Sequence, residues 1–498
     1  MKSYKVFLED TSLEVSSLIV SSQRFNRIWN GIQRSKDQTE LAYFVEFDYE
    51  KPTLLTVVFD GQPIEKVEIR PIAKNYNYVV KGNKIEITID RISHFSVEIN
   101  DYHNALMVFV NPKEKYRPKK NDIYFGAGVH DVGLILPDNN QRVYIDRGAI
   151  VYGVIYVEGK TGVSIEGRGV LDASKYLRPS GVERAGDSKE LSMEMMDGIR
   201  ALKNGNEENC EKDLISQIKE GYSSLIVEQA CDLGISLSAI GTITARNCRD
   251  LKISGIVLID SFFWTLILRS ACENVLIDNV KIVGQWRYNS DGINICDSNN
   301  VTVKNCFIRS FDDCIVVRGG HKLTGAGFGC HNINAINNVC WCDWGKVFEI
   351  WSGDSNSTIS NVKIEENYVI RVSYIVFSID MRYGDEYTIV NNVKYNNIYV
   401  EYDQEHELEQ YQSNEEIKYD CNKKEHNEIL VFISVGTLGI NLGEQRIKVV
   451  EKKKPFIVYK NISYNNIFES EPYGKILLKT DQIDEFFNVT FNGKDINI

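Results

Sequence analysis

The hydrophobic and polar residues of this chain alternate in short bursts that recur along the sequence. One phrase, an asparagine turn joined to short alternating segments, appears at residues 274–280, 300–306, 361–367 and 392–398. A period of roughly 20 to 50 residues built in this way is typical of a solenoid, in which each unit stacks on its neighbour to bury its apolar face. The pattern therefore predicts an all-β fold, a right-handed parallel β-helix.

The segments outside this repeat divide the chain. Residues 1–115 alternate without the repeat and predict a small N-terminal β-sandwich, while a charged stretch with two prolines at 111–122 marks the boundary to a β-helix over 116–498. An insertion at about 174–236 has apolar residues at helical spacing. A highly charged segment at about 401–454 is interpreted as a loop or an oligomer contact, so a homo-oligomer is left open.

The composition limits the kinds of partner that this protein can bind. The formal net charge of −12 over 498 residues argues against nucleic acid and anionic membranes, which both require a basic surface. The sequence has no apolar run long enough to span a bilayer and starts without a secretory signal, so we expect a cytoplasmic protein. A secreted chain whose signal had been removed would look the same. Eleven cysteines without paired spacing favour a reducing compartment.

Three aspartates are the strongest chemical signal. Asp291 and Asp312 are 21 residues apart, close to the repeat of 26 between Asn274 and Asn300, so we expect them one coil apart with Asp313 beside Asp312. Consecutive coils lie about 4.8 Å apart, and like charges this close raise the pKa of at least one carboxyl. Aspartates also cap turns, but that role explains single residues better than a group of three. The spacing therefore predicts an acid and a base.

Aromatic residues and cysteines surround this position. Five of the six tryptophans lie between residues 264 and 351. Trp286, in a polar turn just before Asp291, is interpreted as a platform for the apolar face of a sugar ring. The cluster of Cys330, His331, Cys340 and Cys342 fits no common zinc spacing and is interpreted as coil-core thiols beside a turn histidine, so we expect neither a metal nor a cofactor.

The segments 261–266, 289–295 and 312–318 resemble the signature coils of the inverting glycoside hydrolases of family 28, the polygalacturonases, and their clan relatives in family 49, the dextranases and isopullulanases. The resemblance extends over residues 167–382. It implies a carbohydrate substrate, Asp312 as the general acid, and Asp291 and Asp313 as the pair that activates water.

The sequence departs from family 28 at two motifs. Lys346 replaces the histidine of a Gly-His-Gly motif, and the Arg-Ile-Lys motif that grips a uronic acid has no clear counterpart, although Arg382 lies in that region. A neutral, α-linked sugar is therefore favoured over a galacturonide. The residues expected to bind substrate are Trp286, Arg287, Asn289, Arg318, Lys346, Glu349, Trp351 and Arg382.

Two other classes of function fit the same residues. In a polysaccharide lyase the aspartates would bind Ca²⁺ through oxygen ligands, and Arg318 or Arg382 would remove a proton. In a non-catalytic carbohydrate-binding solenoid, nothing would require the paired acids.

Overall fold

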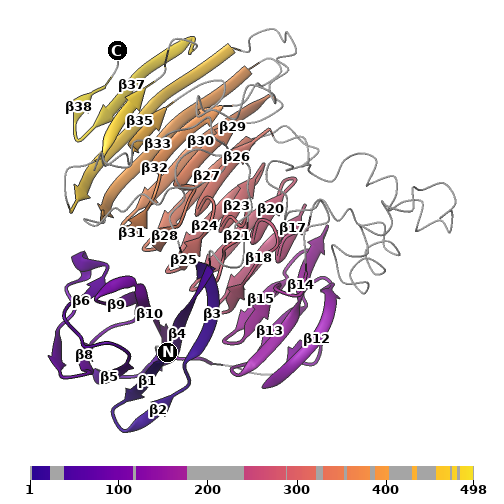
Figure 1. The fold of residues 1–498 in the computed structure, drawn as a ribbon. Helices are drawn as coiled ribbons and strands as arrows, with labels where there is room; N and C mark the ends of the chain where they lie inside the picture. The colour runs from indigo at the N-terminus through magenta and orange to yellow at the C-terminus, as the bar shows by residue number, and fades with distance from the viewer. Residues whose placement is uncertain are drawn as a thin grey trace, which may run out of the picture.

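The computed structural model is an almost entirely β structure (Figure 1). It describes residues 3–22, 39–115, 119–176, 240–287, 289–320, 329–352, 356–381, 387–402, 429–433, 456–470, 474–478, 480 and 483–496. Among these residues, no helix is long and apolar enough to span a membrane. The predicted helical insertion and most of the predicted charged loop lie outside the described residues.

Two five-stranded sheets form the N-terminal part of the chain. The first has the order β2 (Thr11–Leu13), β1 (Ser3–Leu8), β5 (Thr53–Asp60), β8 (Lys84–Ile89) and β7 (Tyr78–Lys81). The second has the order β3 (Ser16–Ser21), β4 (Thr39–Tyr49), β10 (Asp101–Pro112), β9 (Ser93–Ile99) and β6 (Val67–Arg70), and a 3-10 turn, η2 (Ile72–Lys74), follows β6. One apolar cluster, with Val57 and Ile87 from the first sheet and Val97 and Val108 from the second, fills the space between them. This is the predicted β-sandwich.

The remaining strands form one continuous sheet of 28 strands, coiled into three faces. The first face contains β11 (Ile123–Phe125), β13 (Arg142–Ile145), β15 (Ser164–Gly167), β18 (Arg249–Ser254), β21 (Glu273–Asp278), β24 (Asn299–Lys304), β27 (Gly329–Ile336), β30 (Ser357–Glu365), β33 (Tyr387–Val400), β35 (Phe456–Glu469), β37 (Glu485–Phe491) and the antiparallel β38 (Lys494–Asp495). The second face contains β12 (Gly128–Ile135), β14 (Ala149–Glu158), β16 (Val170–Asp172), β19 (Val257–Ile259), β22 (Lys281–Val283), β25 (Phe307–Ser310), β28 (Val339–Cys342) and β31 (Tyr368–Val372). The third face contains β17 (Ile243–Arg246), β20 (Leu266–Arg269), β23 (Ile293–Cys296), β26 (Ile315–Gly319), β29 (Lys346–Ser352), β32 (Ile375–Met381), β34 (Ile429–Ile433) and β36 (Lys475–Leu478).

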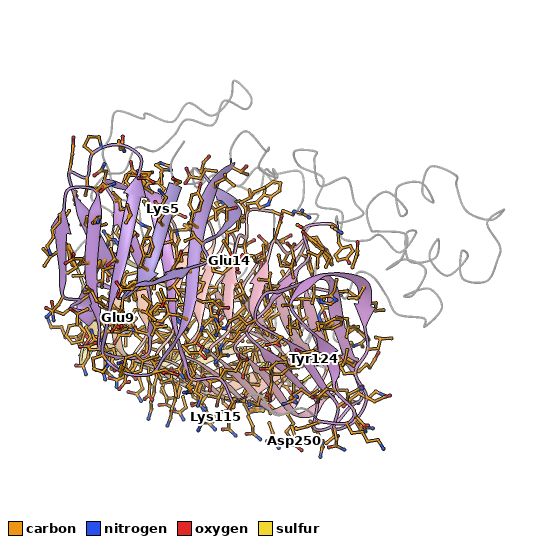
Figure 2. All side chains as sticks on the ribbon, turned by 90° about the horizontal axis from the view of Figure 1, so that it is seen from below. Lys5, Glu9, Glu14, Lys115, Tyr124 and Asp250 are labelled. Carbon is orange, nitrogen blue, oxygen red and sulfur yellow. The ribbon has the colours of Figure 1, made fainter. Side chains whose placement is uncertain are left out.

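The recurring asparagines form a ladder along one edge of the coils. Asn274 donates to Asp250 over 3.1 Å, and Asn300 donates to Asn274 over 3.3 Å. Asn332 and Asn361 continue the series, each donating to the residue one coil before it over 3.0 Å. These residues have φ between 53° and 58°, and asparagine is one of the few residues that adopt this conformation readily. The ladder therefore explains the repeated phrase; its first member, Asp250, lies at the lower edge of the view in Figure 2.

The coil interior is a single apolar cluster that runs from the first coils to Val489. It includes the buried thiols of Cys330, Cys340 and Cys342, as the sequence predicted. The predicted fold class, a right-handed parallel β-helix preceded by a small β-sandwich, is confirmed.

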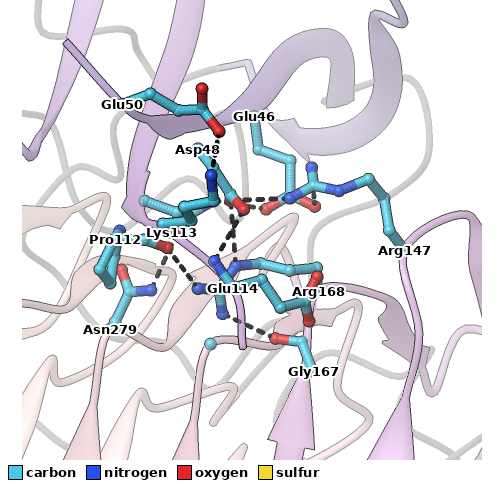
Figure 3. A network of polar contacts seen from close by, with 12 residues as sticks. Glu46, Asp48, Glu50, Pro112, Lys113, Glu114, Arg147, Gly167, Arg168 and Asn279 are labelled. Carbon is cyan, nitrogen blue, oxygen red and sulfur yellow. Dashed lines mark hydrogen bonds and ion pairs between the residues drawn. The ribbon is translucent and has the colours of Figure 1, made fainter. Parts of the chain in front are cut away.

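The sandwich packs against the second face of the β-helix. Phe44 and Phe109 on the sandwich contact a cluster that includes Phe307 and Trp341 on the coils. A polar network borders this contact (Figure 3), in which Asp48 on β4 accepts a hydrogen bond of 2.8 Å from Arg147. The last sandwich strand ends at Pro112 and β11 begins at Ile123, so the predicted boundary near residue 115 lies between them.

A buried ion-pair network joins the same two parts further along. Glu98 on β9 accepts hydrogen bonds from the Nε atoms of Arg70 and Arg371, each over 3.2 Å. Arg70 also pairs with Glu401 over 2.7 Å. All four side chains are buried, and Arg371 and Glu401 belong to the coils. The sandwich is therefore fixed beside the β-helix by apolar packing and by charges that only the folded contact brings together.

Candidate active site

The three aspartates precede two neighbouring strands of the third face. Asp291 stands two residues before β23 and Asp313 two residues before β26, and these strands pair in parallel. The amide of Gly292 donates to the carbonyl of Asp313 over 2.8 Å, so the ladder continues through the turn. Asp291 therefore aligns with Asp313. The coil between them contains 22 residues, so the two acidic turns lie one coil apart, with Asp312 next to the aligned pair.

Two local features shape the turn that carries Asp291. Asn289 adopts a left-handed conformation with φ of 55°. At Gly292 a Cβ atom would lie 2.4 Å from the carbonyl oxygen of Cys314 on the next coil. Only glycine allows the coils to approach so closely here, and the close approach brings the two acidic turns together.

Asp312 is almost completely buried and is held by two hydrogen bonds. The side-chain amide of Asn289 donates to Oδ2 over 3.3 Å, and the backbone amide of Asp313 donates to Oδ1 over 3.0 Å. Burial and then the charge of Asp291 raise the pKa of Asp312 to about 8. At neutral pH this carboxyl therefore retains its proton.

Arg318, on β26, is the hub of the site. Its Nη2 atom lies 3.4 Å from Oε2 of Glu349 and 3.6 Å from an oxygen of both Asp291 and Asp313. Its Nε atom donates to the side-chain oxygen of Asn294 over 3.0 Å. One guanidinium group therefore faces three of the four acids of the site.

Lys346 and Glu349, both on β29, form a second buried pair. The ammonium group of Lys346 donates to Oε1 of Glu349, and its backbone amide donates to Oδ1 of Asp313 over 2.8 Å. Burial alone would raise the pKa of Glu349, but Lys346 and Arg318 lower it to about 2. Glu349 is therefore ionised, and both cations of the site are engaged by it.

Asp291 and Asp313 are both buried, on neighbouring coils, and they differ in their contacts. The side-chain amide of Asn294 donates to Oδ2 of Asp291 over 3.0 Å, whereas Oδ1 is buried and has no hydrogen-bond partner among the described residues. Burial and then the charge of Asp313 raise the pKa of Asp291. Burial and then the charge of Glu349 raise the pKa of Asp313. Such a cluster of perturbed acids is typical of a catalytic site.

The family model "Glycosyl hydrolases family 28" matches residues 238–406, which contain the whole of this site. The predicted resemblance to family 28 and its clan is confirmed. A probable polygalacturonase of Arabidopsis thaliana is 34% identical over 133 residues, 22% of this chain and 29% of that protein. A polygalacturonase of Persea americana is 28% identical over 192 residues, 32% of this chain and 41% of that protein. The matches thus span less than half of these relatives.

One solved structure, "Dex49A from Penicillium minioluteum", has the same fold over a larger part of the chain. The two structures align with a TM-score of 0.53 and 14% sequence identity, over 100% of this chain and 89% of the other. At this identity the likeness shows a shared fold.

Two residues expected to bind substrate are instead engaged inside the protein. Arg287 pairs with Asp260 over 2.9 Å and donates to the carbonyl oxygen of Ser174 over 2.9 Å. Trp286 is 7% exposed and lies against the Arg287 guanidinium, which is 5.4 Å from its ring centre. The exposed sugar platform that we predicted at Trp286 is therefore wrong, because the turn folds back on its own side chains.

The other expected residues divide into three groups. Asn289, Arg318, Lys346 and Glu349 converge with the aspartates as described above. Trp351 is also 7% exposed, and its ring centre lies 4.9 Å from the Arg318 guanidinium. Arg382 lies outside the described residues.

Sequence reasoning missed three residues of the site. Asn294 links Asp291 to Arg318, and its outward position on β23 follows from the alternation after the signature turn. Trp264 faces Arg318 at 4.5 Å. Trp344 is half-buried and stacks on Phe311, 5.7 Å between ring centres, immediately before the acidic pair. Trp344 was visible in the sequence, but nothing there distinguished it from the buried tryptophans.

Proposed function

We propose that this protein is an inverting glycoside hydrolase that cleaves α-linked glycosidic bonds of a poly- or oligosaccharide. The observation that carries the proposal is the contrast between Asp312, whose carboxyl has a pKa of about 8, and Asp291, which has a buried oxygen without a hydrogen-bond partner among the described residues. A proton donor and an acceptor with an unpaired oxygen on adjacent coils are the two groups that glycoside hydrolysis requires.

In this mechanism Asp312 donates its proton to the glycosidic oxygen as the bond to the anomeric carbon breaks. A water molecule held at Asp291 attacks the same carbon from the opposite face and gives up a proton. The acid and base of an inverting enzyme are roughly 6.5 to 9.5 Å apart, which leaves room for this water. The product is therefore expected to have the inverted anomeric configuration.

The pairing of the cations supports a neutral sugar at the cleaved bond. Arg318 and Lys346 both pair with Glu349, and Arg318 also faces two aspartates. A uronic acid at this position would have to compete with these carboxylates for the same donors. The neutral, α-linked substrate that we predicted from the sequence is therefore our first candidate.

A galacturonide is the second candidate. The curated relatives are named polygalacturonases, although they match this chain over only part of their length. Arg269 on β20 is fully buried, and none of its three side-chain nitrogens has a hydrogen-bond partner among the described residues. Arg269 lies in the same column of outward-facing residues as Arg318. Leu268 pairs with Ile295, so Arg269 aligns with Cys296, and Cys296 pairs with Arg318 on the following coil. A cation in this column that lacks a hydrogen-bond partner among the described residues supports an anionic sugar.

The two rival classes fit the site less well. In a Ca²⁺-dependent lyase the acids would converge on the ion, whereas here Asp291, Asp313 and Glu349 converge on Arg318. A carbohydrate-binding solenoid would have no use for a carboxyl whose pKa is raised to about 8. Such burial of an acid costs several kcal/mol, which function best explains.

The test is hydrolysis of paired substrates by the wild type and the Asp312→Asn variant. Neutral α-linked glucans and α-linked galacturonans are each offered, and the anomer of the first product is followed by NMR. We expect inverted product from one of them and a loss of about 10²–10⁴-fold in kcat for the variant, with substrate binding retained. An unsaturated product that absorbs in the ultraviolet would establish a lyase, and substantial activity of Asp312→Asn would refute the assignment.

A further inference from the structure

The charges of the site do not balance when every group is ionised. Four buried acids face two buried cations, so the fully ionised cluster has two uncompensated negative charges: Asp291, Asp312, Asp313 and Glu349 against Arg318 and Lys346. Burial lowers the pKa of Lys346, but the charges of Glu349, Asp313 and Asp380, which is buried on the next strand of the third face, raise it. Uncompensated buried charge is costly. The resting cluster is therefore expected to bind two protons.

One of these protons belongs to Asp312, and the contacts of Glu349 locate the other. Glu349 has the Lys346 ammonium at one oxygen and Arg318 at the other. It is the acid best compensated by cations and is therefore the one that stays ionised. The carboxyl of Asp313 lies within hydrogen-bond reach of Glu349. Two carboxyl groups in such contact require a proton between them, and the ionised partner is the acceptor.

Asp313 also differs from Asp291 in the contacts of its two oxygens. Its Oδ1 accepts the backbone amide of Lys346 over 2.8 Å, and its other oxygen lies beside Arg318. Asp291 keeps one oxygen without a partner in the described part of the chain. An acceptor that is to hold and deprotonate a water molecule needs such a free oxygen. The two aspartates that the family resemblance treats as a pair are thus in different states here.

We propose that Glu349 is a positioning residue that keeps Asp313 protonated, so that Asp291 alone acts as the general base. The assignment rests on the proposed glycosidase function. It leaves Asp291 and Glu349 ionised against Arg318 and Lys346, with one proton each on the other two acids. These six groups together are then electrically neutral before the reaction, and Asp380 lies outside this count.

The proton balance of one turnover follows. Asp312 gives its proton to the leaving glycosidic oxygen, and the attacking water gives one to Asp291 as the new bond to the anomeric carbon forms. The cluster ends with Asp291 protonated and Asp312 ionised, so its total charge is unchanged and Asp313 has not exchanged its proton. Solvent resets the site by moving one proton from Asp291 to Asp312.

The kinetic test compares Asp291→Asn with Asp313→Asn. An asparagine can still donate a hydrogen bond to Glu349 from position 313, but it cannot accept a proton from water at position 291. We expect kcat to fall by about 10²–10⁴-fold for Asp291→Asn and by no more than about tenfold for Asp313→Asn. Equal losses in the two variants would overturn the inference. The Asp312→Asn variant distinguishes a failure of this inference from a failure of the proposed function. If Asp312→Asn stays active, the proposed function is wrong as well.

A spectroscopic test reads the proton directly and does not require an active preparation. The infrared difference spectrum of wild type minus Asp313→Asn at neutral pH should contain the carbonyl stretch of a protonated carboxyl. The same difference taken in the Glu349→Gln background should lack it, because Asp313 then ionises in place of Glu349 beside Arg318 and Lys346. A carboxylate band in the first difference, or an unchanged protonated band in the second, would overturn the proposal even in a folded but inactive protein.

Discussion

A methyl group added at Gly345 would collide with the residue that we assign as the general acid. A Cβ atom at this position would lie 2.5 Å from Oδ1 of Asp312, 2.6 Å from the backbone nitrogen of Asp313 and 2.7 Å from the carbonyl carbon of Asp312. Non-bonded carbon atoms pack at about 3.5–4.0 Å. Because two of the three atoms belong to the backbone, a side-chain rotation cannot relieve the contact, and the two coils must separate by about 1 Å.

The magnitude follows from this displacement. A shift of about 1 Å in a catalytic group can reduce the rate by about 10²-fold, and overpacking of a filled interior costs about 1–3 kcal/mol of stability. We therefore expect Gly345→Ala to lower kcat by about 10²-fold and the free energy of unfolding by about 1–3 kcal/mol. Steady-state kinetics on the substrate identified above and urea unfolding measure the two effects.

Gly169 provides the matched control. A Cβ atom there would lie 2.4 Å from the carbonyl oxygen of Asp146 and 2.9 Å from that of Ala149, an overlap of the same kind in the first coils of the β-helix. Gly169→Ala should lose comparable stability and keep its kcat. The reasoning is refuted if Gly345→Ala turns over at the wild-type rate, or if Gly169→Ala loses as much activity as Gly345→Ala.

Three further predictions concern stability. Burial and the charge of Asp291 raise the pKa of Asp312 to about 8, against about 3.9 in an unfolded chain, so the fold loses stability as pH rises from about 4 to about 8. In urea unfolding, Asp312→Asn should lose less stability than the wild type over this window. An identical pH dependence of the two proteins would contradict the assignment. Arg269→Met removes a buried charge that has no hydrogen-bond partner among the described residues and should raise the free energy of unfolding by about 1–4 kcal/mol, whereas a decrease would contradict this reasoning. Glu98→Gln leaves two buried arginines undercompensated and should cost about 3–5 kcal/mol, while Glu50→Gln, in an exposed ion pair with Lys113, should leave the unfolding midpoint unchanged.

The repeat was readable from the sequence because its cause is local. An asparagine in the left-handed conformation is needed at each turn of the ladder, as at Asn274 and Asn300, and the strands between the turns bury every second residue, as in β21 and β24. Both features repeat at the coil period, so they are visible without knowledge of the rest of the molecule. The convergence of the acidic turns followed from the same period.

The error at Trp286 arose where the backbone leaves the regular strand. The number of residues that a turn inserts varies from coil to coil: the coil from Asn274 to Asn300 has 26 residues, whereas the coil from Asp291 to Asp313 has 22. Trp286 stands in a polar sequence, but the turn folds so that Arg287 reaches Asp260 and covers the indole. Polar neighbours in the sequence predict that a side chain is exposed only where the backbone is extended, and the backbone around Trp286 forms a turn.

The pairing of Lys346 with Glu349 has a cause of the same kind. Strict alternation would place residues three apart on opposite faces of a strand. At the corner that leads into β29, however, Val347 and Phe348 both point into the core, and the preceding coil does the same with Cys314 and Ile315. After two consecutive residues that face inward, the next residue faces outward. Lys346 and Glu349 therefore lie on the same outer side of the strand and form their ion pair. The corner of the coil, and not the strand, thus brings the second acid-cation pair to the turn that carries Asp313, and any substitution that restores simple alternation there should separate Glu349 from Asp313.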